Sequence, residues 1–208
     1  MTSVTTDGRS RRAQEKRKTR RAEILSAAER VIAKRGYQAT SIADVLEAAQ
    51  ISRGTFYLYF DSRESLFHEL ISGFIQQLMG CIKVVHREEG DPVGGLYANV
   101  SRVVDLLFDN PNLTTILLRE AVGQDAVVDQ KLNDLYAFLY KMVSGALKNG
   151  SAWGITRKVD ERVVAMAIIG SIKEVLYQYL VIHTNQTPDR ETIAQELLAF
   201  GLKGLQTS

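Results

Sequence analysis

The sequence predicts an all-α protein in which a three-helix, helix-turn-helix head at the N-terminus is fused to a larger helical bundle, with about nine helices in total. Apolar residues recur at three- and four-residue steps along almost the whole chain, which is the spacing of an amphipathic helix. Only 3 of the 208 residues are proline, so few positions interrupt a helix. Hydrophobic residues make up 45% of the chain, and the length suits a small domain joined to a larger one.

The first helix is expected to begin near Arg21. Residues 1–20 are polar, basic and aperiodic, and we interpret them as a flexible arm. Gly36 stands where the helix should stop, since glycine is the usual residue just past a helix C-terminus. The apolar face of this helix comprises Ile24, Ala27, Ala28, Val31 and Ile32.

Three further helices follow: two short ones within the head and a fourth that continues beyond it. Thr40 or Ser41 can cap a short second helix, which ends near Gln50. Ser52 can cap a third short helix, and a fourth begins shortly after it and runs toward His86. Two short helices joined by a tight turn form a compact unit only if they cross at a steep angle, which is helix-turn-helix geometry.

The remaining chain predicts longer helices that pack as a bundle. We place the head at residues 21–67 and a ligand-sensing and dimerisation domain at residues 68–208, with the fourth helix shared between them. The start and stop signals in the second domain are Pro92, Asp109-Asn110-Pro111, Asp125, Asn149-Gly150, Asp160, Asp189 and Gly204.

Basic charge is concentrated at the N-terminal end. Residues 1–60 contain 12 of the 26 lysines and arginines but only 6 of the 24 acidic residues. A polyanion is therefore expected to bind near this end of the chain. Charge alone leaves open a solvated basic tail without a partner.

Several other classes of protein are not expected. The longest apolar run, residues 163–169, is far shorter than the roughly 18 residues that span a bilayer, so no membrane partner is expected. The single cysteine, Cys81, cannot form an internal disulfide, which suits a cytoplasmic protein. The chain has no HExxH, GxSxG or P-loop spacing, so we expect no enzyme activity, no metal and no cofactor. A helical adaptor that binds an acidic protein or membrane surface is the other alternative.

The third helix has the size and composition of an element that reads DNA. A single short helix fits a major groove about 12 Å wide. Arg53 can pair with a guanine edge, while Thr55 and Leu58 can contact thymine methyl groups. The hydroxyls of the tyrosines, Tyr57 and Tyr59, can reach phosphates, and the phenylalanines of this segment, Phe56 and Phe60, are expected in the core.

Four segments of the head resemble the DNA-binding region of the tetracycline-repressor-like (TetR) family. The resemblance covers about residues 20–70, and residue type agrees with spacing across four helices. It implies a sequence-specific transcriptional regulator, in which a homodimer binds a palindromic double-stranded DNA operator and a small-molecule effector controls binding. The segments are Ile24-Leu25-Ser26-Ala27-Ala28, Gly36-Tyr37-Gln38-Ala39-Thr40-Ser41, Ile51-Ser52-Arg53-Gly54-Thr55-Phe56-Tyr57-Leu58-Tyr59-Phe60 and Ser62-Arg63-Glu64-Ser65-Leu66.

The resemblance also implies a role for individual residues of the head. Thr40 would contact a phosphate, and Tyr59 and Arg63 would hold the DNA backbone. Two positions depart from the usual pattern: Gln50 replaces the common glycine, and Arg63 replaces the more usual lysine. If position 50 needs a positive φ, glutamine costs about 1 kcal/mol there. The groove-facing residues would be Arg53, Gly54, Thr55, Tyr57 and Leu58.

In the bundle, the resemblance implies a dimer interface on the last two helices and an effector pocket among the middle ones. The segments 117–123 and 170–176 are similar to family members that sense fatty acyl compounds, so the effector is expected to be hydrophobic or acyl-like. An ordinary core remains the alternative for each aromatic residue and for the interface residues, and a surface ion pair remains the alternative for Arg119. Candidate pocket residues are Phe108, Arg119, Tyr136, Tyr140, Trp153, Tyr177 and His183. Candidate interface residues are Val164, Ile168, Ile172, Leu197, Leu198 and Leu202.

Overall fold

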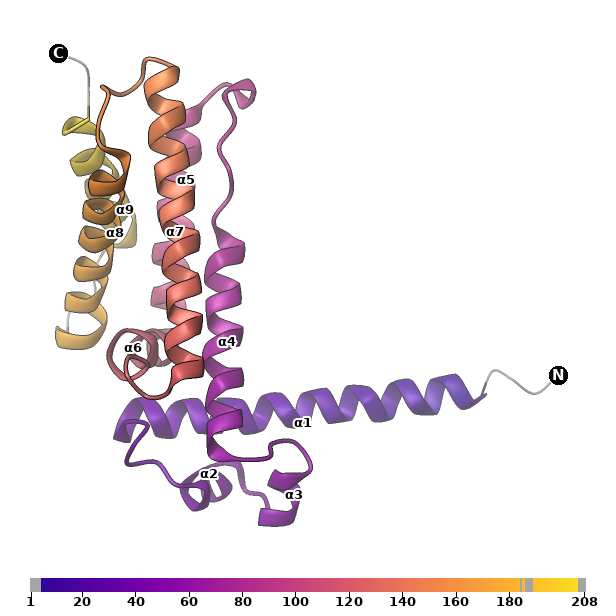
Figure 1. Cartoon of the computed structure of the whole chain (residues 1–208). Helices are drawn as coiled ribbons and strands as arrows, with labels where there is room; N and C mark the ends of the chain where they lie inside the picture. Colours follow the sequence, from indigo (N-terminus) through magenta and orange to yellow (C-terminus); the bar gives the residue numbers. More distant parts are fainter. Residues whose placement is uncertain (1–4, 184, 186–188, 206–208) are drawn as a thin grey trace. The chain divides into compact units, whose positions relative to one another are not determined.

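A computed structural model describes residues 5–183, 185 and 189–205 and shows nine α-helices and no strand among them (Figure 1). The chain divides into two compact units, Met1–Leu70 and Ile71–Ser208, which we call the head and the bundle. The all-α fold predicted from the sequence is confirmed. The helix α4 contains the boundary, so the continuous helix passes from the head into the bundle.

The head is built from short helices that pack on the C-terminal half of α1. Its core consists of large side chains that are almost fully buried, among them Ile24, Phe56 and Phe67. The helix α1 packs against α2, and α2 packs against α3. The bounds are α1 Thr5–Arg35, α2 Ile42–Ala49, α3 Arg53–Tyr57 and α4 Arg63–Cys81.

Side-chain caps define where α2 begins. The hydroxyl of Ser41 accepts a hydrogen bond from the Asp44 backbone N–H at 3.2 Å, and the Ser41 backbone N–H donates to the Asp44 carboxylate at 2.8 Å. This reciprocal pair satisfies backbone donors that the first turn of a helix leaves free. Ser41, rather than Thr40, is therefore the N-cap of the two residues that the sequence offered.

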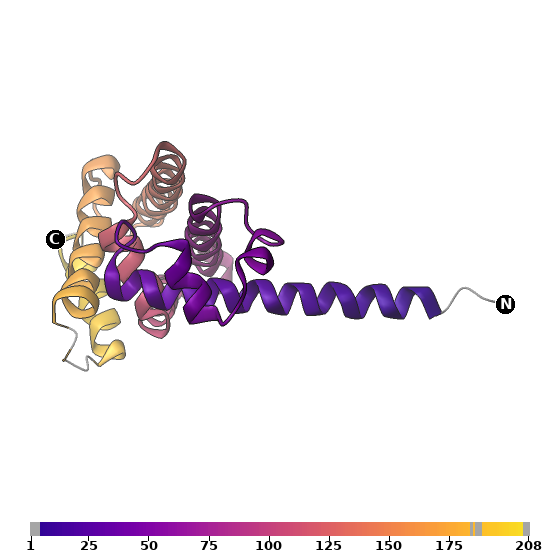
Figure 2. The same ribbon diagram turned by 90° about the horizontal axis from the view of Figure 1, so that it is seen from below.

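The N-terminal segment corrects one prediction. Instead of an irregular arm, residues from Thr5 onward form the first four turns of α1, which extend beyond the other helices of the head in both ribbon views (Figures 1 and 2). Arginine, lysine, glutamine and alanine all have high helix propensity. The apolar periodicity used for prediction is missing because the described side chains from Ser10 to Thr19 are exposed and bury no face.

The turn between α2 and α3 has the strained geometry that the sequence raised as a possibility. Gln50 has φ 51° and ψ 51°, and it is the only residue other than glycine with a positive φ in the part of the chain that the structure describes. Its backbone N–H closes the end of α2 by donating to the Glu47 carbonyl at 3.2 Å. The position therefore needs the left-handed conformation that glycine adopts without a Cβ clash.

In the bundle, α5 packs against α9 and α7 packs against α8. Asp91, Asp125, Asp160 and Asp189 cap α5, α7, α8 and α9, respectively, through their carboxylates. Figure 1 shows α7 and α8 running beside each other. The bounds are α5 Pro92–Asp109, α6 Pro111–Thr115, α7 Ala126–Ala152, α8 Glu161–Tyr177 and α9 Arg190–Lys203, with a 3-10 turn at Arg87–Glu89 and π-helical turns at Ile116–Glu120 and Gln178–Ile182.

The fourth helix ends at Cys81, earlier than the predicted end near His86. Arg102 of α5 donates from Nε to the Cys81 carbonyl at 2.8 Å. Asn99 accepts from the Lys83 backbone N–H and donates to its carbonyl, both at 2.8 Å. These side chains on α5 satisfy backbone groups that would otherwise continue the helix, so the chain leaves α4 in an extended form.

One helix is more apolar than the sequence count suggested. The stretch Glu161–Ile182 is long enough to cross a membrane and contains an 18-residue window with a mean hydropathy of 1.4, although the longest uninterrupted apolar run is short. In that window 22% of the residues are buried, and many of the others are half-buried. Its inward side packs on α7, where Ala165 and Leu147 are both buried in one cluster.

Candidate functional site

The short helix α3 presents one face outward and anchors the other in the core of the head. The hydroxyl of Ser52 accepts from the Thr55 backbone N–H at 3.1 Å and so sets the start of the helix. Phe56 is fully buried, whereas 47% of Tyr57 and 69% of Leu58 are exposed. Both predicted core residues, Phe56 and Phe60, are confirmed as buried.

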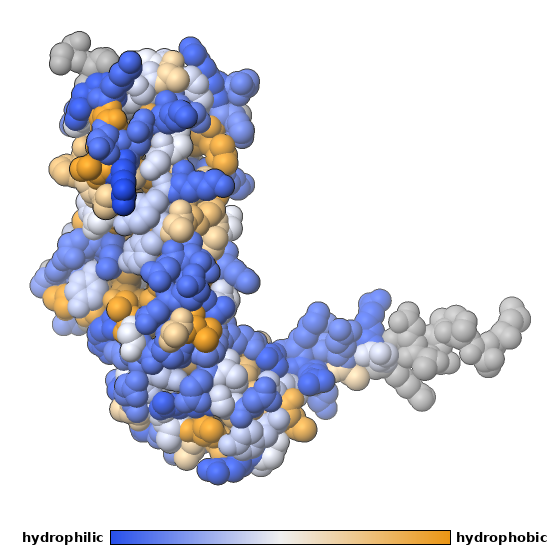
Figure 3. Space-filling model, viewed as in Figure 1, coloured by the Kyte–Doolittle hydropathy of each residue, from blue (hydrophilic) through white to orange (hydrophobic). Residues whose placement is uncertain are grey.

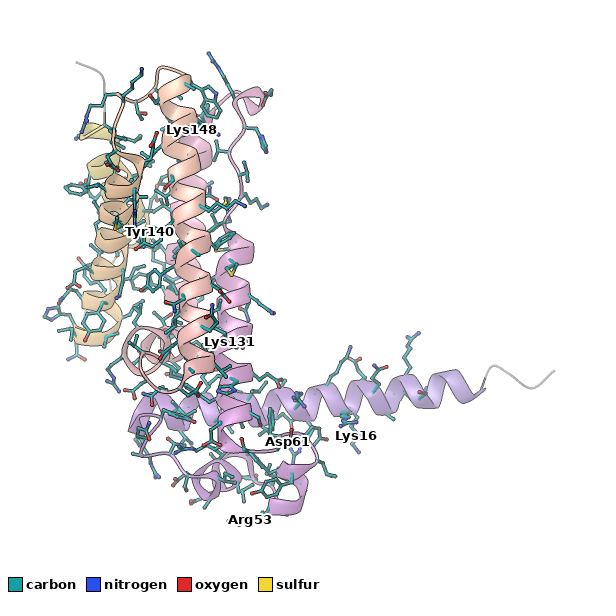
Figure 4. The ribbon with its side chains drawn as sticks, in the orientation of Figure 1. Lys16, Arg53, Asp61, Lys131, Tyr140 and Lys148 are labelled. Atoms are coloured by element: carbon teal, nitrogen blue, oxygen red, sulfur yellow. The ribbon has the colours of Figure 1, made fainter. Side chains whose placement is uncertain are left out.

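The outer surface of α3 combines a cation with small and apolar groups. Arg53 is exposed, and Figure 4 places it at the outer edge of the head, away from α1. Gly54 is exposed as well, and a Cβ added there would meet nothing nearer than the Ser52 Oγ at 3.9 Å. Packing within the chain therefore does not require a glycine at this position. Thr55 is half-buried, with its Oγ1 2.9 Å from the Ser52 Oγ.

Thr40 does not occupy the exposed position that the resemblance implied. Its side chain is 1% exposed, and its hydroxyl donates to the Gly36 carbonyl at 2.8 Å. Its backbone N–H donates to the Tyr37 carbonyl at 3.1 Å. Both donors of Thr40 thus stabilise the turn between α1 and α2, so the predicted phosphate contact is corrected to a structural role.

Arg63 likewise makes its contacts inside the head. Its Nη1 donates to the Thr40 carbonyl at 2.9 Å, and its guanidinium lies 4.5 Å from the centre of the Tyr37 ring. The Tyr37 ring in turn stacks on Phe67 at 4.0 Å. Arg63 therefore joins the start of α4 to the turn before α2, and a bound DNA backbone would compete with these contacts.

Two arginines of α1, Arg17 and Arg21, which the sequence placed at or within a basic arm with a possible role in phosphate contact, bind within the head instead. Arg21 donates to the Tyr59 carbonyl at 2.7 Å and lies 4.5 Å from the centre of the Phe60 ring. Arg17 donates to the Leu58 carbonyl at 3.4 Å, with its guanidinium 6.0 Å from the centre of the half-buried Tyr59 ring. Both side chains hold the segment that leaves α3.

The bundle contains a cavity of about 460 Å³. Its walls come mainly from α5, α7, α8, α9 and the segment after α4, and they are mostly apolar, with leucine, isoleucine and valine most frequent. Its charged lining residues are three lysines, Lys83, Lys141 and Lys173, and no aspartate or glutamate stands among the described residues that line it. A cavity of this size falls in the range of small-molecule sites.

Only some of the predicted pocket residues line the cavity. Tyr136 and Trp153 line the cavity, whereas Phe108, Arg119, Tyr140, Tyr177 and His183 do not. Arg119 is paired with Glu120 at 2.7 Å, which is the surface ion pair left open above. The Phe108 ring lies 5.5 Å from the Arg190 guanidinium. Aromatic side chains were overrated as ligand contacts because leucine, isoleucine and valine form most of the wall.

The predicted interface residues are all half-buried in the bundle. Five of them, Ile168, Ile172, Leu197, Leu198 and Leu202, line the cavity, and Val164 packs on the cluster of Leu147, Ala165 and Leu205. The exposed apolar side chains of α8 and α9 are instead Val163, Met166 and Phe200. The apolar residues of each helix therefore fall on two sides, one of which lines the cavity and includes the predicted set, and the dimer interface itself stays a prediction.

Comparison with known proteins agrees with this arrangement. Residues 24–70 match the family described as bacterial regulatory proteins, tetR family. The chain is 27% identical to the fatty acid metabolism regulator protein of Bacillus subtilis (strain 168), over 88% of this chain and 94% of the relative. It is 26% identical to the HTH-type transcriptional repressor KstR2 of Rhodococcus jostii (strain RHA1), over 89% and 91%.

A solved structure shows the same fold. The transcriptional regulator FadR from Bacillus subtilis, crystallised in complex with stearoyl-CoA, has a TM-score of 0.71 to this chain at 24% identity, with 89% of this chain and 99% of that one covered. A short helix with an outward polar face on a buried aromatic anchor, together with these relatives, defines a helix-turn-helix transcriptional regulator. Its residues 24–70 have the DNA-binding head of the TetR family.

Proposed function

We propose that this protein is a cytoplasmic, ligand-responsive repressor that binds a palindromic operator as a homodimer. The observation that carries the proposal is the two-sided character of α3, in which Phe56 is buried while Tyr57 and Leu58 are exposed. Exposed Leu58 is costly in water but gains contact with thymine methyl groups in a major groove. Arg53 supplies the donor pair for a guanine edge.

Gly54 supports the same interpretation. Nothing in the protein limits a side chain at this position, and glycine lowers the stability of a helix by about 1 kcal/mol relative to alanine. A close approach of DNA to the backbone at Gly54 explains why a glycine stands there. In this proposal, Arg53, Gly54, Thr55, Tyr57 and Leu58 face the groove.

The dimer is proposed from the low burial of α8. A helix whose most apolar 18-residue window has a mean hydropathy of 1.4, and which exposes Val163 and Met166, leaves apolar surface for another partner. Lys173 and Glu174 lie within this helix, and charged groups are costly inside a bilayer, so a second copy of the chain is the better partner. Val163, Met166 and Phe200 would form the apolar part of a self-complementary interface.

The effector is proposed to have a long apolar body and an anionic end. The aliphatic walls favour an acyl chain, and the three lining lysines without a facing carboxylate favour a negative group. The FadR structure was solved in complex with stearoyl-CoA, which has this chemistry. A long-chain acyl-CoA is therefore the effector class that we propose for the cavity.

The proposed control is a population shift. An effector that fits the cavity better in one arrangement of the dimer moves the equilibrium by its difference in affinity, typically about 5–150-fold. Release from the operator follows if the favoured arrangement no longer matches the spacing of successive groove faces, about 34–36 Å.

Selection of bound sequences from random double-stranded DNA tests the proposal. We expect a palindrome whose half-sites are about 10 base pairs apart, or a multiple of that distance. Arg53→Ala and Gly54→Ala should lower operator affinity while the circular dichroism spectrum stays unchanged. Enrichment of no sequence, or variants that bind as tightly as wild type, would contradict sequence-specific recognition.

A second experiment tests the effector separately. The selected operator is titrated with stearoyl-CoA, with free coenzyme A as the matched control that lacks the acyl chain. We expect stearoyl-CoA to release the protein from the operator in a concentration-dependent way, and free coenzyme A to leave the complex intact. Equal effects of the two compounds, or none over a chain-length series, would contradict an acyl effector while leaving the DNA-binding proposal intact.

A further inference from the structure

The N-terminal part of α1 forms a charged helix outside the segment that matches the family. We call residues 5–20 the extension. The family match begins at residue 24, whereas α1 begins at Thr5. The extension contains seven lysines and arginines against two acidic residues. In Figure 3 its described surface is almost entirely hydrophilic.

The basic side chains of the extension are available for a partner. Arg11, Arg12, Lys16 and Lys18 are exposed, and none has a hydrogen bond or ion pair within the part of the chain that the structure describes. Figure 4 shows Lys16 projecting from α1 beyond the packed part of the head. Like charges on one helix repel each other, so the bare extension gains stability when an anion binds.

Arg17 fixes where the extension runs. Its side chain donates to the carbonyl of Leu58, which is the C-cap residue of α3. The extension therefore leaves the head next to the C-terminal end of the helix that we propose for the major groove. An element inserted in a groove has a sugar-phosphate strand on either side, and 16 helical residues reach about 24 Å.

We propose that the extension is a second DNA-binding surface, which contacts phosphates of the duplex beside the half-site without reading sequence. This inference rests on the proposed function, because it takes α3 to lie in the groove. Each neutralised phosphate releases condensed counterions, so binding by the extension increases the salt dependence of the DNA affinity. The partner is the duplex backbone that continues past the recognised bases.

The test uses the full chain and fluorescence anisotropy at several salt concentrations. The variant Arg12→Gln/Lys16→Gln removes two exposed charges one turn apart, and glutamine preserves helix propensity. The control Lys131→Gln/Lys148→Gln removes two charges of α7, which Figure 4 shows in the bundle. Three duplexes are compared: the selected operator alone, the same operator with ten added base pairs on each side, and a scrambled sequence of the longer length.

We expect the extension variant to bind the longer duplex about tenfold more weakly at low salt, with the slope of log K against log salt reduced by about 0.9 for each phosphate that the variant no longer neutralises. Operator and scrambled duplexes should be weakened by the same factor, and the advantage of the longer duplex should shrink. The control variant should retain the wild-type slope. The proposal is overturned if the extension variant retains that slope, or if the control is weakened as much.

The outcomes separate this inference from the proposed function. If Arg53→Ala loses operator affinity while Arg12→Gln/Lys16→Gln does not, the groove contact stands and the extension has another role. If neither variant changes binding, both proposals fail. Circular dichroism of each variant, with helix content equal to that of wild type, shows that the weaker binding is not due to unfolding.

Discussion

Arg21 and Glu69 form a bidentate ion pair that joins the middle of α1 to α4 within the head, with the Arg21 Nε 2.6 Å from the Glu69 Oε1. The same guanidinium donates to the Tyr59 carbonyl and covers the Phe60 ring, so one side chain connects α1, α4 and the end of the proposed recognition segment. The hydrogen bonds that Arg21 donates to the Glu69 carboxylate raise the pKa of Arg21 above its ordinary value. The segment that follows α3 is thus held in place by Arg21, which Glu69 of α4 in turn holds in position.

A double-mutant cycle with Arg21→Met and Glu69→Met should give a coupling energy of about 1 kcal/mol in urea unfolding. Both side chains are more than a third exposed, so solvent screening keeps the value well below that of a buried pair. Arg21→Met should lose more stability than Glu69→Met, because only the arginine also binds the Tyr59 carbonyl. Additive single losses would show that the pair contributes nothing.

Replacement of Gln50 by glycine should stabilise the protein by about 0.5–1 kcal/mol. The gain arises because glycine adopts φ 51° without a Cβ clash, and it is partly offset by greater freedom of glycine in the unfolded chain. Thermal unfolding measures the change, and Gln50→Val, which is β-branched, should instead lower the melting temperature. A glycine variant less stable than wild type would show that the Gln50 side chain makes a contact worth more than the strain.

Acid should remove the contribution of the Asp44 capping box. Hydrogen bonds from the Ser41 hydroxyl and backbone, with Arg35 alongside, hold the pKa of Asp44 below its ordinary value. The folded-state pKa is thus lower than the unfolded one, so the carboxylate stabilises the fold above the ordinary pKa, about 4, and this is lost as pH falls through the folded pKa. Wild type should exceed Asp44→Asn in urea stability at pH 7, and the difference should close below pH 4. A constant difference across this range would contradict the assignment.

Core and surface residues of α3 should separate cleanly by substitution. Phe56→Ala removes a fully buried ring and should cost about 3–5 kcal/mol in the free energy of unfolding. Leu58→Ala changes a mostly exposed side chain, so stability should hold within about 0.5 kcal/mol while operator affinity falls. Urea unfolding and anisotropy on the selected operator measure the two effects. If Leu58→Ala lowers stability and leaves DNA binding unchanged, Leu58 is a core residue and not a DNA contact.

What the sequence predicted well was governed by local rules. The burial of Phe56, the caps at Ser52 and Asp160 and the strained turn at Gln50 follow from side-chain chemistry within a few residues. The size and composition of the third helix predicted the outward side chains of α3, and the resemblance to TetR heads added Gly54. Local pattern therefore predicted the helices of the head and the exposed residues of α3, while their role in DNA recognition stays a prediction.

The errors concern tertiary packing. Thr40 is buried with its hydroxyl hydrogen-bonded to the Gly36 carbonyl. The residue types at these two positions do not indicate this contact. On α8, Met166 faces out and Ile168 faces the cavity, and only the position of α7 decides which apolar side is inner. Helicity of the extension was missed because a fully exposed charged helix has no apolar period.

Gly201 offers a way to close the cavity without touching the head. It lies on α9 and lines the cavity, and a Cβ added there meets no atom within 4 Å. Gly201→Ala should stabilise α9 by up to about 1 kcal/mol and leave the effector response unchanged, because one methyl group occupies little of a 460 Å³ cavity.

Gly201→Trp should fill part of the space that an acyl chain needs. Operator affinity should then match wild type, while the stearoyl-CoA concentration that releases half of the DNA should rise at least about tenfold, the loss expected when an acyl chain leaves two methylene groups unburied. Anisotropy on the selected operator, with the alanine variant as the matched control, measures both quantities. If the tryptophan variant is released at the wild-type concentration, the effector does not occupy this cavity.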